Sequence, residues 1–318
     1  MYLLVVKQLC TMFIIGIGGF IFAKYFKVTD EQQKFLSKLL LYFINPCLVI
    51  NSFNKEFQAD ILLQLGFVIL SSAIVFIVTM VVAKLFTLNK KGDDPIVVKE
   101  NAYNTVDRLA IIFTNCGFMG IPLIRGVFGD EGVFFLMGYL VVFNVFLWTY
   151  GLFTISGTMS FKKIITNPNI IAIMAGIGLF CMPFTLPEII ARPITMISDL
   201  NTATAMILIG VLFADFKFEK EYGLRLVKVT FLRLVVTSLV TLAVIWGIYA
   251  VTHRYFDSRM MLFVVFICSM CPSATSIPSL SCVFDKDARY ASLVVSTTSL
   301  VCMFTIPSFV ALAEQIIN

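Results

Sequence analysis

Two short stretches of small, polar and cyclic residues interrupt apolar runs of the 318-residue chain. The first runs from Thr114 to Pro122 as TNCGFMGIP, and the second from Met270 to Pro278 as MCPSATSIP. Both end in Ile-Pro, and their prolines are 156 residues apart. Such residues interrupt the hydrogen bonds of a helix and leave backbone groups without partners. In a membrane, backbone of this kind is tolerated only where it is buried in protein or lines a cavity. A matched pair of interrupted segments is typical of the binding site of a secondary transporter.

Helix ends that meet at two such interruptions could bind ions. N-terminal helix ends attract anions, and unwound carbonyl groups attract cations. The alternative interpretation is ordinary proline kinking of two membrane helices. The predicted substrate-binding residues at the interruptions are Asn115, Cys116, Gly117, Pro122, Pro272, Ser273, Thr275 and Pro278.

Three asparagines inside apolar runs are further candidates. Asn45 and Asn201 are also 156 residues apart. A buried amide costs free energy unless it is hydrogen-bonded, so each of the two either binds a ligand or joins two helices. Asn144 lies close to the first interruption, and its amide is a candidate for lining the substrate cavity.

Asp199 is the only acid deep inside a predicted span, and with Asn201 it is the candidate for binding a coupling proton or sodium ion. The alternative places Asp199 near the outer interface. Arg125 could bind a carboxylate substrate through its two-pronged guanidinium, or it could reach the interface or pair with Asp130 or Glu131.

The composition bounds the class of protein. The chain is 59% apolar and 14% charged, with a mean hydropathy of +0.94, whereas soluble domains carry about 25% charged residues. We therefore expect an integral membrane protein, mostly helical. A single histidine, His253, lies outside the predicted spans, so a histidine-based catalytic or metal centre is excluded. Neither a cofactor motif nor a basic patch for nucleic acid is present, and we expect no enzyme activity and no cofactor.

A membrane-spanning helix needs about 20 apolar residues. The chain contains ten candidates, which divide into halves of five at residues 1–157 and 158–318. An odd number of spans per half predicts an inverted repeat. The predicted spans are 3–23, 35–53, 61–86, 109–128, 133–157, 168–186, 189–213, 227–251, 260–280 and 291–316.

Positive charge predicts the orientation of these spans, because lysine and arginine accumulate on the cytoplasmic side. Eighteen of the 24 basic residues fall on one side, Arg233 among them. This side is predicted to be cytoplasmic, which places both termini outside. The six basic residues of the other side are Lys7, Lys55, Arg125, Arg192, Arg254 and Arg259.

The run from Asn115 to Leu123, followed by FGDEG from Phe128, resembles the auxin efflux carrier family, as do Phe143-Asn144 with Trp148 and NPNIIA from Asn167. The resemblance covers the whole chain. It implies two inverted five-helix repeats with broken, crossing fourth and ninth helices. It also implies a scaffold of helices 1, 2, 6 and 7, which could form a homodimer, and a transport bundle of helices 3–5 and 8–10 that moves as an elevator.

Two features depart from the family pattern. The long hydrophilic loop of the plant carriers is absent, and the second interruption has Cys271-Pro272 in place of an asparagine-proline pair. We predict a secondary or facilitative carrier for small organic anions, such as malate or auxin-like acids, in a bacterial plasma membrane. The alternative is a proton- or sodium-coupled carrier or exchanger for a neutral or cationic solute.

Overall fold

The computed structural model describes residues 1–89, 92, 94–182, 184–214 and 222–317, and their regular structure is helical apart from one isolated β-bridge. Lys90, Lys91, Lys217 and Lys220, which belong to the predicted cytoplasmic charge, lie outside the described residues. The α-helices of the first half are α1 (Tyr2–Phe26), α2 (Asp30–Leu39), α3 (Asn45–Phe53), α4 (Ala59–Phe86), α5 (Pro95–Ile112), α6 (Ile121–Phe146) and α7 (Leu152–Ser156). Those of the second half are α8 (Phe161–Ile165), α9 (Pro168–Phe180), α10 (Glu188–Ala214), α11 (Gly223–Phe231), α12 (Thr237–Thr252), α13 (Arg259–Met270), α14 (Ser276–Val283) and α15 (Ala288–Ile316).

Short π-helical segments lie within several long helices. Extra residues in such segments shift the helix register, and they occur often at functional sites. The first segment directly precedes Asn45-Pro46, where proline has no N–H to donate to the preceding turn. The described π-helical segments are η1 (Leu40–Ile44), η2 (Cys116–Gly120), η3 (Leu147–Gly151) and η5 (Leu232–Val236).

Seven helical runs among the described residues are long and apolar enough to cross a membrane. They confirm the prediction of an all-helical, membrane-spanning protein. The predicted fourth span, 109–128, begins in α5 and continues after the interruption into the run Cys116–Ser156. That run also contains the predicted fifth span, and it bends at Gly129, where φ is 66°. The predicted ninth span is divided between α13 and α14, and α9 is only 13 residues long. The number of ten spans therefore stays a prediction.

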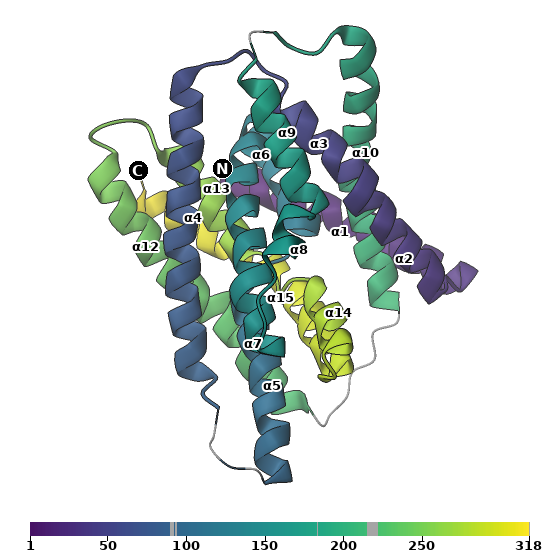
Figure 1. Cartoon of the computed structure of the whole chain (residues 1–318). Coiled ribbons are helices and arrows are strands. Elements are labelled where there is room, and N and C mark those ends of the chain that lie inside the picture. The colour runs from purple at the N-terminus through teal and green to yellow at the C-terminus, as the bar shows by residue number, and fades with distance from the viewer. Residues whose placement is uncertain (90–91, 93, 183, 215–221, 318) are drawn as a thin grey trace.

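The helices pack in two groups. In the first group, α1 packs on α10, and α3 packs on α9 and α10. In the second, α4 packs on α6 and α12, α13 packs on α6 and α12, and α14 packs on α15 (Figure 1). The groups meet where α1 contacts α6 and α15, and where α10 contacts η2. These are the helices that the family resemblance assigns to a scaffold and to a transport bundle.

Glycines allow α1 and α10 to approach closely. A Cβ atom on Gly210 would lie 2.0 Å from the carbonyl oxygen of Gly16, and one on Gly19 would lie 2.6 Å from that of Ile207. Small residues let membrane helices bring their backbones together, where packing rather than hydrophobicity drives association. The glycines therefore set the geometry of the first group.

The two chain ends lie next to each other. The amino group of Met1 is 2.8 Å from a carboxylate oxygen of Glu314, near the end of α15 (Figure 1). Both termini thus lie on the same side of the molecule, and their location outside the cytoplasm stays a prediction.

Candidate functional site

The two interruptions lie against each other in the second group of helices. Phe113 is extended after α5, and Cys271 is extended after α13 because a proline follows it. Thr114 and Ser273 form an antiparallel bridge. The N–H of Asn115 donates to the oxygen of Pro272 at 2.7 Å, and the N–H of Ala274 donates to that of Phe113 at 2.9 Å. Two segments separated by half the chain therefore satisfy part of each other's freed backbone.

Helices resume on the far side of each interruption and leave polar groups unused. The Oδ1 atom of Asn115 accepts from the N–H of Phe118 at 3.4 Å, while its buried Nδ2 has no hydrogen-bond partner. The buried hydroxyl of Ser276, at the start of α14, also has none. A Cβ atom added to Gly117 would have no other heavy atom within 4 Å, so there is open space beside this glycine. Unpaired buried donors at the beginnings of two helices are suited to receive an anion.

The other predicted residues of the interruptions have structural contacts. The Ser273 hydroxyl donates to Ala110 O at 2.9 Å, and its N–H donates to Thr298 Oγ1 at 3.1 Å. The oxygen of Pro122 accepts from Gln8 of α1 at 2.9 Å. Cys116 and Pro272 are buried, whereas Thr275 and Pro278 are half-buried in or beside the first turn of α14.

Asn45 and Asn201 bind each other. The Nδ2 atom of Asn201 donates to Asn45 Oδ1 at 2.7 Å, and both residues are buried. The bond joins the first residue of α3 to the middle of α10. The sequence leaves open whether these asparagines bind a ligand or join two helices, and in the structure they form a hydrogen bond between helices.

Asn144 is also engaged within the protein. Its Nδ2 donates to Leu140 O at 2.8 Å, and its Oδ1 accepts from Asn167 at 3.1 Å. Asn167 caps the beginning of α9. The amide of Asn144 thus links α6 to α9, and a substrate would have to compete with these bonds.

Asp199 and Arg125 form an ion pair between the two groups of helices. The carboxylate of Asp199, in the middle of α10, is 2.7 Å from the Arg125 guanidinium, and its side chain is 59% exposed. Arg125 also lies 3.1 Å from Asp130, as one of the interpretations of the sequence predicts. Asp199 is therefore an exposed, paired acid rather than an isolated buried one.

Arg233 is a residue of the site that sequence reasoning assigned to the cytoplasmic side. Its side chain is fully buried and extends from η5 to the interruptions. It donates to the carbonyl oxygens of Ile111, Ser269 and Cys271, which lie at the C-terminal ends of α5 and α13. Its position inside the predicted span 227–251 was the available signal, because intramembrane charges are rare and face the protein interior.

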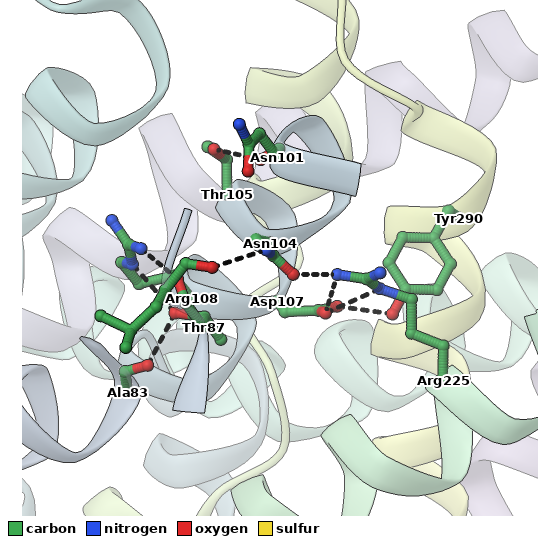
Figure 2. Close-up of polar contacts among 10 residues, drawn as sticks. Ala83, Thr87, Asn101, Asn104, Thr105, Asp107, Arg108, Arg225 and Tyr290 are labelled. Atoms are coloured by element: carbon green, nitrogen blue, oxygen red, sulfur yellow. Dashed lines mark hydrogen bonds and ion pairs between the residues drawn. The ribbon is translucent and has the colours of Figure 1, made fainter. Parts of the chain in front are cut away.

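A second polar cluster fixes α5 away from the interruptions. Asp107 is buried and lies 2.7 Å from Arg225 of α11, and Tyr290 of α15 donates to its other oxygen at 2.5 Å (Figure 2). Arg225 also donates to Asn104. Arg108, one turn from Asn104, donates to the end of α4 at Thr87 (Figure 2). Asp107 is thus a buried link among α5, α11 and α15.

An apolar cavity of about 250 Å³ lies between the two groups of helices. It reaches the first interruption at Met119, and its other walls come from α1, α10 and α15. Among the described residues of its lining, Ser299 alone carries a hydroxyl. The lining residues are Met12, Phe13, Gly16, Ile17, Phe20, Met119, Met206, Ile209, Gly210, Phe213, Ser299 and Leu300.

Comparison with known proteins agrees with this architecture. A family model described as "Membrane transport protein" matches residues 4–160 and again residues 154–310. An uncharacterized transporter of the fission yeast Schizosaccharomyces pombe is 33% identical over 82 residues, which are 24% of this chain and 18% of the yeast protein. The chain thus spans about a fifth of that relative's length. Because the family model covers nearly the whole sequence, the chain belongs to the membrane transport protein family, the auxin efflux carrier family that its motifs resemble, which is a family of transporters and not of enzymes.

Proposed function

We propose that the protein is a secondary carrier for small organic anions, mono- or dicarboxylates, and that the carboxylate binds at the paired interruptions. The observation that carries the proposal is the unpartnered Nδ2 of Asn115, buried at the start of the η2–α6 run. An unsatisfied buried donor costs about 1–3 kcal/mol, which a bound acceptor would recover. The Ser276 hydroxyl offers a second group at the start of α14.

The charges at the interruptions support an anion over a cation. Each helix N-terminus carries the equivalent of about half a positive elementary charge. Arg233 donates to the carbonyl ends of α5 and α13 and offsets their partial negative charge, so the positive ends at Asn115 and Ser276 are not cancelled. No ion pair joins Arg233 to a carboxylate of the described residues. An ion exchanger needs acidic side chains at this place. The sequence has none between Thr114 and Pro122 or between Met270 and Pro278.

Alternating access is proposed to follow from movement between the two groups of helices. Their interface includes the apolar cavity, whose lining offers few directional bonds to break. The described polar contacts across it include Gln8 with Pro122 and Arg125 with Asp199. An exposed ion pair contributes only about 0–1 kcal/mol to stability, so the pair of Arg125 with Asp199 can break during each transport cycle. Asp199 stays the candidate for coupling transport to protons or sodium, and the plasma membrane stays the proposed location.

Uptake into proteoliposomes tests the proposal. Labelled mono- and dicarboxylates are offered to the reconstituted protein, and binding is measured by competition. Asn115→Ala should weaken the apparent Kd about 10- to 100-fold, because a hydrogen bond to a charged group contributes about 1.5–3 kcal/mol. Asn51→Ala is the matched control. It removes an amide bonded to Thr195 in the first group of helices, and it should leave the Kd unchanged. Transport of no organic anion would contradict the proposal, as would equal effects of the two variants.

A further inference from the structure

Arg233 holds the carbonyl ends of both broken helices at once. It is among the largest fully buried side chains of the described residues. Its Nη1 atom donates to Ile111 O at 3.0 Å, and its Nη2 atom donates to Ser269 O and Cys271 O at 2.5 Å each. Thr237, one turn further along the same helix run, is also within reach of Nη1. The guanidinium therefore contacts the last turn of α5 and that of α13.

The charge of Arg233 matches the helix ends that it contacts. A helix C-terminus carries the equivalent of about half a negative elementary charge, so two such ends together carry about one. One guanidinium neutralises this charge. A buried charge without such partners would be strongly unfavourable, which explains why Arg233 is stable without a carboxylate partner. The N-terminal ends at Asn115 and Ser276 keep their partial positive charge.

Exposed carbonyl groups at the C-terminal ends of broken membrane helices are the groups that coordinate sodium in coupled carriers. Here the guanidinium occupies that position. The residue 156 positions earlier is Ile77, so the first half of the chain has no equivalent arginine, and one side chain serves both helix ends. We infer that Arg233 is a resident cation that replaces a coupling metal ion at the interruptions, so that the anion is bound there without sodium.

This inference rests on the proposed function but is tested without a substrate. Purified ligand-free protein is unfolded by heat in sodium, potassium or choline chloride at equal ionic strength. The wild type should show the same Tm in all three salts. Arg233→Gln leaves the carbonyl groups unneutralised, so its Tm should be lower. Millimolar sodium, potassium or methylguanidinium should raise the Tm of Arg233→Gln by at least about 2–4 °C. Arg233→Lys, which keeps the charge, should respond less than Arg233→Gln.

Arg108→Gln is the matched control, because Arg108 also donates to a carbonyl group at a helix end, at Thr87. Its Tm should not depend on the cation. The inference is overturned if sodium raises the Tm of the wild type, or if no small cation stabilises Arg233→Gln. If Arg233→Gln does not fold, uptake by Asp199→Asn decides, because this variant lacks the other candidate sodium site. Organic-anion uptake that still needs sodium contradicts the inference and leaves the proposed function intact. Equal uptake in sodium and choline supports the inference. Absence of all organic-anion transport contradicts the proposed function alone.

Discussion

At the scale of single residues, the polar groups of the apolar spans divide by whether they have protein partners. Asn45, Asn201, Asn144 and Ser273 bind other parts of the chain. Asn115 keeps a free donor although it is 4% exposed. Buried polar groups are nearly always satisfied, and among the unpartnered donors of the described residues the Asn115 amide and the Ser276 hydroxyl lie at the starts of the helices that follow the interruptions. Asn115 therefore carries the functional proposal, and the other four position the helices around it.

The Asn45–Asn201 bond is expected to contribute modestly to stability. Hydrogen bonds between membrane helices average about 0.6 kcal/mol and reach about 1.7 kcal/mol in double-mutant cycles. Asn45→Ala, Asn201→Ala and the double variant should show a coupling free energy in this range when unfolding is measured in mixed micelles. Substrate affinity should not change. A loss of affinity in both single variants, with no coupling in stability, would instead indicate that the pair binds a ligand.

At the scale of elements, the helix breaks were predictable and their contacts were not. The two interruptions predict the breaks after α5 and α13, because glycine and proline act locally, and the Ile-Pro pairs lie in the first turns of α6 and α14. The pairing of Thr114 with Ser273 depends on packing between segments far apart in sequence. The contacts of Arg233 with the carbonyl groups of α5 and α13 could not be predicted either, since they also depend on packing between distant segments. The positive-inside rule counts basic residues and does not consider which face of a helix they occupy. The ion pair of Asp199 with Arg125 likewise joins helices that the sequence does not place side by side.

Close packing of α1 on α10 yields a prediction with an internal control. Gly210→Ala would put a methyl group 2.0 Å from a backbone oxygen of α1, so the helices must separate. Overpacking of this kind costs about 1–3 kcal/mol. Gly247→Ala, in α12, meets nothing within 4 Å and should be neutral or slightly stabilising. Thermal unfolding in detergent compares the two variants, and an equal Tm would contradict the close approach.

At the scale of the whole molecule, transport is proposed to require that the two groups of helices move relative to each other. A short bifunctional thiol reagent tests this in a background without the native cysteines. Linking Arg125→Cys to Asp199→Cys joins the groups and should stop uptake driven by the substrate gradient alone, which needs no coupling through Asp199, until the link is reduced. Linking Asn51→Cys to Thr195→Cys, both within the first group, should leave uptake unchanged. Full uptake by the first linked variant would show that the groups do not need to separate there.

A structure of the protein with a transported carboxylic acid that carries bromine would locate the bound anion. We expect the carboxylate at hydrogen-bond distance, about 2.7–3.2 Å, from Asn115 Nδ2, with the first turn of α14 on its other side. The apolar part of the acid should extend toward Met119. A carboxylate bound at Arg125, or an acid seated only in the apolar cavity away from Asn115, would show that the paired interruptions are not the binding site.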